Sequence, residues 1–419
     1  MTVYLSLFLI PILLNSLPIK FNKNSNKVLL ISFTILCAIL IGFKYQVGGD
    51  WGVYEKYIIG ANAVNLSVMF STKDPGFMSL LWISSYLGLG QTGINLFCSS
   101  IFMLGLYRVC KNQPYPWLAL IVAFPYLITV VGFGYTRQSM VIGIFFLAYT
   151  YWQEDKKFSS IKILILIMFG FLFHKSILIF APLIFIQKKG FIINKNLLII
   201  SLPILLLLTF YNYSYLQLIW KFYVVQSQLH STISESSQAS IAYGSAIRSY
   251  MNIPAFILFC LFFKKFELFN DRRLLSIAAI ISIILIIFTP YASTLLDRLG
   301  LYFILFQILI YSRIPLFFKD IHLKNLYVYG VTIFYLIVFI VWFNYSNSSV
   351  AWKPYKITLF KPTYYINSWI LSDELINFDI SKSINNLEEY NQIIEKYGQE
   401  GLESKDINKL LKKDKTFKY

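Results

Sequence analysis

The sequence predicts an all-α, polytopic integral membrane protein of roughly 11–13 helices, some of them short, broken or re-entrant. Two observations carry this prediction. Of the 419 residues, 57% are apolar and only 14% are charged, and the mean hydropathy is +0.62. Soluble domains carry about a quarter charged residues, so this composition excludes an ordinary water-soluble protein. In addition, apolar runs that approach the ~20 residues of a transmembrane helix recur along nearly the whole chain.

The predicted helices are the apolar runs that remain when charged residues are taken as boundaries. In chain order these runs are 4–19, 28–47, 76–89, 93–107, 117–131, 139–152, 161–186, 197–211, 253–263, 274–288, 299–311 and 326–343. The first run has no basic stretch before it and three lysines after it, at positions 20, 23 and 27. We therefore expect a retained helix with its N-terminus outside, and no cleaved secretory signal.

Two of these runs predict broken helices. Run 161–186 is interrupted by His174-Lys175 and has lysine pairs at both ends, which predicts a hairpin of two short helices. Run 76–89 is short and bracketed by Pro75 and several glycines, so we expect it to enter the membrane without crossing it. Short broken helices persist at membrane depth only beside protein or a water-filled cavity. Both places are therefore candidate walls of a site.

The distribution of charge predicts the two sides of the membrane and the domain boundary. The net charge is +17, and residues 1–372 hold 29 Lys and Arg against ten Asp and Glu. By the positive-inside rule, cytoplasmic loops lie near residues 20–27, 108–111, 156–157, 188–195, 264–273 and 313–324. Because the basic residues are scattered between apolar spans, no nucleic acid partner is expected. Residues 1–372 form the predicted membrane domain, and residues 373–419 a charged tail, either amphipathic helix or disordered.

Few acidic groups remain for chemistry on the outer side. Near the bilayer core an ionised side chain costs at least about 2.5 kcal/mol, so each needs a partner or a function. The outer candidates are Asp50, Glu55, Asp74, Glu235 and Asp297, with His174 and His230. Asp50 follows two glycines and precedes Trp51 and Tyr54, an arrangement that suits a sugar ring, although it also suits a helix cap. His174 interrupts an apolar hairpin, and imidazole titrates in the range that neutral-pH proton transfer requires.

Cationic residues on the same side predict an anion site. Arg137 starts a helix, where its guanidinium and the free amides together favour phosphate. Arg298 and the turn Lys353-Pro354-Tyr355-Lys356 are further candidates, and Arg248 is the least informative. Polar and aromatic neighbours complete a predicted sugar-binding surface: Trp51, Tyr54, Tyr135, Gln138, Tyr302 and Tyr355. The chain lacks an ATP-binding glycine loop, a metal-ligand cluster and a serine nucleophile motif. We expect no cofactor and no metal, and a substrate that arrives already activated.

Five short motifs occur in series over roughly residues 28 to 356. They are GGDWGVY at 48–54, RQ at 137–138, FHKS at 173–176, DR at 297–298 with YF at 302–303, and WKPYK at 352–356. In these motifs the chain resembles the EpsG/Wzy-type polysaccharide polymerases of bacterial membranes. The tail after Asp373 lies outside the resemblance.

The resemblance implies a GT-C-like polymerase architecture and an activity. A growing glycan on undecaprenyl diphosphate would be transferred to the next lipid-linked repeat unit on the outer face of the bacterial plasma membrane, building O-antigen, capsule or exopolysaccharide. Arg137, Arg298, Lys353, Lys356 and Arg248 would stabilise the departing diphosphate, and His174 or Asp50 would serve as the base, with Arg137 also counted as catalytic. The implied partners are the lipid-linked glycan, membrane lipids and a chain-length regulator protein.

Two other functions fit the same composition. A lipid-linked oligosaccharide transporter would have a similar cationic lining without chemistry, but its charges should extend through the bilayer depth. Another polyprenyl-phosphate-dependent glycosyltransferase or an O-antigen ligase is the second alternative. Glycosyltransferases of this kind usually place acidic residues in a large outer loop after the first helix, whereas here the corresponding loop is basic and predicted to be cytoplasmic.

Overall fold

The computed structural model describes residues 1–17, 22–61, 74–154, 159–184, 248–288 and 293–358, with the isolated positions 196, 199–200 and 203. The predictions for the tail 373–419, for most of run 197–211, and for His230 and Glu235 lie outside the described residues. Throughout the described ranges the chain is helical without a β-strand, which confirms the predicted all-α class.

The helices follow the predicted apolar runs closely. The α-helices are α1 (Thr2–Ser16), α2 (Lys23–Gly42), α3 (Trp51–Ala61), α5 (Pro75–Tyr86), α6 (Gly90–Lys111), α7 (Pro116–Ala123), α8 (Thr136–Glu154), α9 (Ser159–Phe171), α13 (Asn252–Leu261), α14 (Arg272–Phe288), α15 (Ser293–Arg313) and α16 (Ile321–Tyr345). Shorter elements are the π-helix η1 (Phe124–Gly132) and the 3₁₀ segments η2 (Lys175–Ile184), η5 (Lys265–Leu268), η6 (Ile314–Phe317) and η7 (Asn347–Trp352). Among the described residues, four helical segments are long and apolar enough to cross a membrane: Asn24–Gly42, Gly90–Lys111, Arg298–Phe317 and Ile321–Tyr345.

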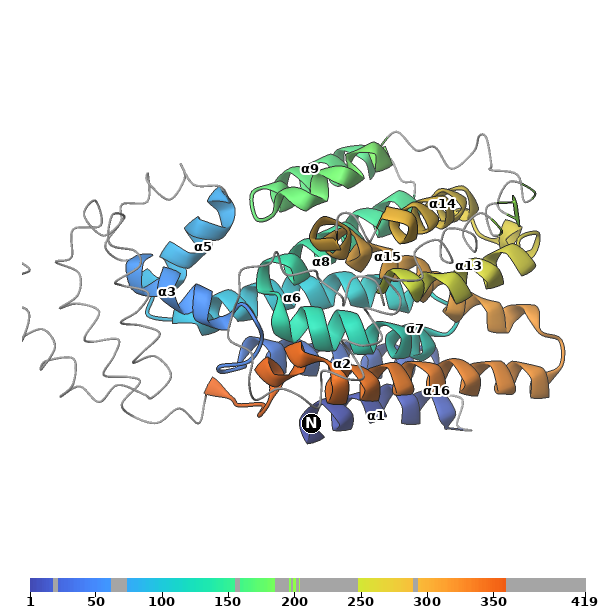
Figure 1. Cartoon of the computed structure of the whole chain (residues 1–419), viewed down its shortest axis with the longest axis horizontal. Coiled ribbons are helices and arrows are strands. Elements are labelled where there is room, and N and C mark those ends of the chain that lie inside the picture. The colour runs from blue at the N-terminus through green and yellow to red at the C-terminus, as the bar shows by residue number, and fades with distance from the viewer. Residues whose placement is uncertain are drawn as a thin grey trace, which may run out of the picture.

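Helix α7 and its π-helical continuation η1 form the centre of the bundle. Every residue from 117 to 134 is buried, as expected for a helix that is apolar on all sides. Figure 1 shows α1 and α16 side by side along one face, with α6, α7, α8 and α15 in the middle. Phe8 of α1 stacks on Phe124 of η1 with ring centroids 4.5 Å apart. By contrast, α16 exposes large apolar side chains such as Leu326 and Ile333, which suits contact with lipid.

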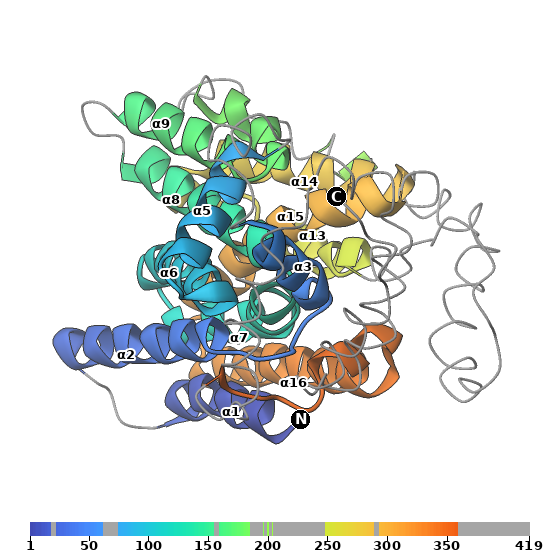
Figure 2. The ribbon, with the colours of Figure 1, turned by 90° about the vertical axis from the view of Figure 1, so that its left-hand side faces the viewer.

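A close crossing of α6 and α8 brings the beginnings of both helices to one end of the bundle. A Cβ atom at Gly105 would lie 2.2 Å from the carbonyl oxygen of Gly143, and one at Gly143 would lie 2.5 Å from the Cα atom of Phe102. The two backbones are therefore in direct contact, as small residues permit between membrane helices. Helices α3 and α5 lie at the same end, on the left in Figure 1 and in front of the bundle in Figure 2.

The structure differs from the predicted runs at several places: α3 (Trp51–Ala61) has no predicted counterpart, and α2 and α16 each begin five residues before their predicted runs. Helix α2 ends at Gly42 and does not reach position 47, because residues 43–48 pair with residues 351–358 and then turn at Gln46 (φ +50°) and Gly48 (φ +97°). Helix α15 begins at Ser293, six residues before the predicted run 299–311, and it includes Arg298. Hydropathy detects only the apolar part of a helix, so it does not detect the polar first turns of α15. The predicted hairpin over 161–186 is confirmed as α9 and η2, which meet at His174.

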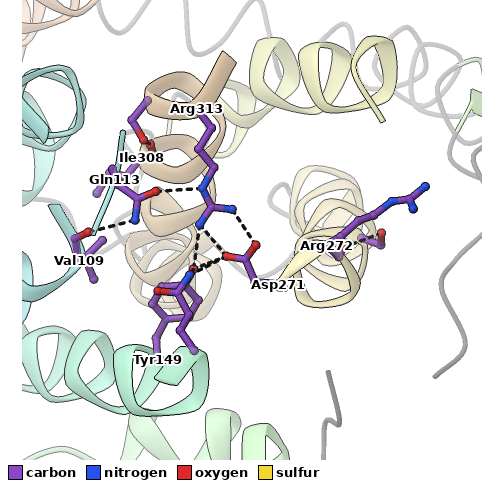
Figure 3. A network of polar contacts seen from close by, with 10 residues as sticks. Val109, Gln113, Tyr149, Asp271, Arg272, Ile308 and Arg313 are labelled. Carbon is purple, nitrogen blue, oxygen red and sulfur yellow. Dashed lines mark hydrogen bonds and ion pairs between the residues drawn. The ribbon is translucent and has the colours of Figure 1, made fainter. Parts of the chain in front are cut away.

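The opposite end of the bundle is closed by a buried polar network (Figure 3). The Arg313 guanidinium forms two hydrogen bonds of 2.7 Å with the carboxylate of Asp271, and its Nε donates to Gln113 at 2.9 Å. Tyr149 also donates to Asp271. Burial alone would raise the pKa of the Asp271 carboxyl, but the guanidinium and these hydrogen bonds bring that pKa below its ordinary value. Arg298 and Arg313 are 15 residues apart on α15, so this network lies about 22 Å along that helix from Arg298.

Candidate functional site

A chain of hydrogen bonds connects two carboxylates through Arg137 at the α3/α5 end. Arg137 donates from Nη1 to Oδ2 of Asp74 at 2.7 Å and from Nε to the hydroxyl of Tyr54 at 3.1 Å. The Tyr54 hydroxyl in turn donates to Oδ2 of Asp50 at 2.9 Å. The guanidinium also lies over the ring of Phe77, 5.1 Å from its centroid. We call Asp50, Tyr54, Asp74 and Arg137 the arginine relay.

The backbone before α3 places Asp50 in the arginine relay. Gly48 has φ +97°, and a Cβ atom there would lie 2.4 Å from the carbonyl oxygen of Phe133, so the turn requires glycine. Asp50 directly precedes α3, and the main-chain carbonyl of Asp50 accepts from the amide of Tyr54 at 3.2 Å. The carboxylate and the tyrosine hydroxyl therefore meet one turn apart on the same face.

A second contact brings His174 toward Asp74. The amide of Gly76, in the first turn of α5, donates to the carbonyl of Leu172 at 2.9 Å, and this joins α5 to the end of α9. A Cβ atom at Gly76 would lie 2.8 Å from Cβ of Leu172, so this close approach also requires glycine. Asp74 and His174 each lie two residues from this contact, and the Asp74 charge acts on the imidazole.

His174 is held by the turn that follows it. Its Nδ1 accepts a hydrogen bond from the amide of Ser176 at 3.2 Å, so the neutral ring carries its proton on Nε2. The Ser176 hydroxyl lies 2.7 Å from the hydroxyl of Tyr302, one turn beyond Arg298 on α15. On α8, Gln138 donates to the main-chain carbonyl of Arg298 at 3.0 Å. These contacts bring the start of α15 against α8 and the α9–η2 hairpin.

The pKa shifts show that the charges of this site act on one another. Burial lowers the pKa of His174, and the positive charges of Arg137 and Arg298 lower it further, so the ring is neutral at pH 7. Burial raises the pKa of Asp50, while the Tyr54 hydrogen bond and the cations Lys44, Arg137 and Arg298 oppose that rise. Arg137 and Arg298 therefore lie on the same end and share two titratable neighbours.

The WKPYK segment packs against the helices of the bundle. Trp352 is buried and donates from its indole to the carbonyl of Thr129 at 2.9 Å, while Tyr355 donates to the carbonyl of Leu40 at 2.8 Å. Lys353 donates to the Phe343 carbonyl and the Ser349 hydroxyl, and Lys356 donates to Gln46 at 3.1 Å. These contacts fix the segment to the bundle and do not join either lysine to the arginine relay.

The other predicted residues occupy structural positions beside or away from the relay. Arg248 is buried, with its guanidinium 5.5 Å from the ring centroid of Tyr126 in η1. Tyr135 packs edge-on against Trp352, with centroids 6.1 Å apart. The Trp51 ring is buried against Tyr45. The Trp51 indole nitrogen is buried without a hydrogen-bond partner, so this neighbour of Asp50 keeps an unused donor.

Two residues at this end were not assigned a role from the sequence. Asp74 is one of the predicted outer acids, but nothing local distinguished it from Glu55. Lys44 lies inside the predicted helix 28–47. The residues that its side chain contacts, Phe133 and Thr136, are almost a hundred positions away in the sequence. The only sign in the sequence that Lys44 has a special role is that a charged residue stands within an apolar run.

A family model described as the EpsG family matches residues 26–357, well over half of the chain. No curated protein and no solved structure matches the chain.

Proposed function

The chain belongs to the EpsG family, and from this membership we propose that it polymerises oligosaccharide repeat units carried on undecaprenyl diphosphate. The membership supports a role of the polysaccharide-polymerase type in general. The apolar helices support a multi-pass membrane protein. The finer proposal places the reaction on the outer face of the bacterial plasma membrane, with a lipid-linked glycan as both donor and acceptor.

The observation that carries the proposal is a set of contacts that brings two arginines toward Asp50 and His174. Arg137 reaches Asp50 through Tyr54. The first turns of α15, which include Arg298, contact the His174 hairpin through Tyr302 and Ser176. Glycan transfer from a diphosphate needs positive charge where the leaving group departs and a base where the acceptor hydroxyl attacks. Two guanidinium groups supply fixed charge, because arginine stays protonated and offers a planar fork of donors to phosphate oxygens. Lys353 and Lys356 have no part in this form of the proposal, since their hydrogen bonds go to Phe343, Ser349 and Gln46. Arg248 is also left out, because its guanidinium lies over the ring of Tyr126 in η1.

The geometry also favours one of the two bases expected from the sequence. With its Nδ1 accepting from Ser176, neutral His174 presents an N–H, and so acts as a hydrogen-bond donor to the substrate. Asp50 is then the base. Burial raises its pKa, which brings a carboxylate closer to the range where it accepts a proton effectively.

The proposed step balances as follows. The acceptor hydroxyl oxygen attacks the anomeric carbon of the donor sugar and forms the new glycosidic bond. The bond between that carbon and the diphosphate oxygen breaks, and the leaving diphosphate keeps the electron pair beside Arg137 and Arg298. The hydroxyl proton passes to Asp50. Neither oxidant nor nucleotide enters this balance.

The test is a gel of surface glycan from cells in which the gene is deleted and then restored. Deletion should remove the ladder of long chains while a single repeat unit remains; complete loss of glycan would instead indicate a transporter or ligase. Restoration with Arg137→Ala should leave the ladder missing although the protein inserts, and Arg137→Lys should restore it partly, since lysine cannot reproduce both hydrogen bonds of the guanidinium.

A matched control is Arg108→Ala. Arg108 is also a helical arginine in an ion pair, 3.8 Å from Glu154, but it lies near the C-terminal end of α6, away from the site. This variant should restore the full ladder. Normal chain lengths with Arg137→Ala would remove Arg137 from the mechanism, and full polymerisation by Asp50→Asn would remove Asp50 as the base.

A further inference from the structure

Lys44 is a buried cation just beyond the end of α2. Only 2% of the residue is exposed. Its Nζ donates to the carbonyl oxygen of Phe133 at 2.6 Å and to the hydroxyl of Thr136 at 3.4 Å. Both acceptors are neutral, and a buried ammonium group with neutral partners is unfavourable compared with an apolar side chain of the same shape. A lysine at this position therefore calls for a reason beyond packing.

The two acceptors flank the turn that leads into α8. Phe133 follows η1, and Thr136 is the first residue of α8, directly before Arg137. The Thr136 hydroxyl donates to Oδ1 of Asn95 in α6 at 3.0 Å. Lys44 thus links the end of α2 to the start of α8, and through Thr136 to α6, one residue from the guanidinium that the proposed function depends on.

Lys44 is itself held in place by the chain around it. The neighbouring amide of Tyr45 donates to the carbonyl of Lys356 at 2.9 Å, and the amide of Thr358 donates to the carbonyl of Phe43 at 2.7 Å. Lys44 and Ile357 form an isolated antiparallel bridge between these two segments. The backbone that carries Lys44 is therefore anchored on both sides, and its ammonium group is held by the Phe133 carbonyl and the Thr136 hydroxyl.

The positive charge of Lys44 acts on Asp50, the base of the proposed reaction. The titratable groups that act on Lys44 are the carboxylate of Asp50 and the thiol of Cys98 in α6. Lys44 opposes the rise in the pKa of Asp50 that burial causes, together with Arg137 and Arg298. Burial also lowers the pKa of Lys44 itself to about 8. The ammonium is therefore charged at neutral pH and loses its charge in mildly alkaline solution.

We infer that Lys44 is a positioning residue of this site. Its two hydrogen bonds fix the turn that presents Arg137, and its charge favours the carboxylate form of Asp50, without contact to the substrate. The inference rests on the proposed function in one respect, namely that Arg137 and Asp50 act on a lipid diphosphate and an acceptor hydroxyl.

The experiment compares the purified full-length wild type with Lys44→Arg, Lys44→Met and Lys356→Met, reconstituted in vesicles with lipid-linked repeat units. Polymerisation is measured from pH 5 to 9.5. Wild-type activity should fall above about pH 8. Lys44→Arg should remain active above that pH, since a guanidinium stays charged. Lys44→Met should lose most activity, and its acid limb should move up by about one pH unit as Asp50 becomes harder to ionise. Lys356→Met, an exposed lysine in the adjacent segment, should match the wild type.

A second readout separates this inference from the proposed function. Binding of inorganic pyrophosphate is measured by calorimetry at pH 7 for the same proteins. Lys44→Met should bind several-fold more weakly than the wild type, while Lys44→Arg and Lys356→Met should not. If the wild type binds pyrophosphate but makes no polymer, the proposed function is overturned. The comparison of pyrophosphate binding between the Lys44 variants and the wild type still tests the role of Lys44. Equal binding by Lys44→Met and the wild type, or an unchanged alkaline limb in Lys44→Arg, would overturn the role of Lys44. If Lys44→Met does not fold, the Lys44→Arg profile alone decides.

Discussion

Substitution of Asp271 by asparagine should destabilise the protein far more than removal of an exposed carboxylate a few residues away. In the network at the end opposite the site, the Asp271 and Arg313 side chains are 0% and 2% exposed, and the carboxylate accepts from Arg313, Tyr149 and Gln153. Asparagine leaves the guanidinium buried without a counter-charge, which costs about 3–5 kcal/mol. That is about two to four orders of magnitude in the unfolding equilibrium.

Glu267→Gln is the matched control. Glu267 pairs with Arg272 at 2.6 Å, a shorter separation than the buried pair has, but its side chain is 61% exposed. Exposed pairs contribute about 0–1 kcal/mol, so distance alone is a poor guide and burial decides the outcome. The assay is the midpoint of thermal unfolding of the purified protein in detergent. Equal midpoints for Asp271→Asn and Glu267→Gln would refute the reasoning.

A double variant tests the physical cause. If the loss comes from an uncompensated charge, replacing both partners, as in Asp271→Leu with Arg313→Met, should recover most of the stability that Asp271→Asn loses. The pH dependence has a definite sign as well. Because the folded pKa of Asp271 lies below its ordinary value of about 3.9, the stability it contributes is present above that value and is lost as pH falls through the folded pKa. This pair should therefore add no slope to the midpoint between about pH 5 and 8.

Three further outcomes are expected. Asp74→Asn should lower the KM for the lipid-linked substrate several-fold with kcat preserved, because the partly exposed carboxylate competes with diphosphate for Arg137; an unchanged KM in a steady-state assay would exclude that competition. His174→Gln should polymerise better than His174→Ala, since the amide retains an N–H donor, whereas equal inactivity of both would return His174 to the role of base. Gly134→Ala should abolish folding, because a Cβ atom there would lie 2.0 Å from the buried indole of the WKPYK segment, while Gly330→Ala should give a monodisperse elution profile, since nothing lies within 4 Å.

The helices could be predicted because contact with lipid and burial in the protein both require apolar side chains. Runs of apolar residues between charges located most of the described helices, and the break at His174 marked the α9–η2 hairpin. The polar ends of helices could not be located this way. Helix α15 extends through Ser293 and Arg298, and α2 stops early because residues 43–48 pair with residues 351–358. Pairing between segments some 300 positions apart leaves no local signal in either of them.

The candidate site could be predicted only as a set of charge types. Asp50, Arg137, His174 and Arg298 were recognisable because each is costly in an apolar setting, and in the structure the two arginines act on both Asp50 and His174. Sequence cannot show the direction of a long side chain, so Lys353 was grouped with them although it turns toward the end of α16.

The charges of the site nearly balance one another. Lys44, Arg137 and Arg298 bring three positive charges, and Asp50 and Asp74 bring two negative ones, with His174 neutral. The cluster is therefore close to balanced, which limits the cost of removing its partly buried members from water. On the proposed function, a lipid-linked diphosphate diester carries two negative charges and leaves with three, while the proton of the acceptor hydroxyl neutralises Asp50. The negative charge gained by the leaving group equals the charge lost at the base, so the total is unchanged and only its position moves toward the arginines. Stabilisation then increases along the reaction without any change in net charge, which is the condition for fixed cations to favour the transition state over the bound substrate.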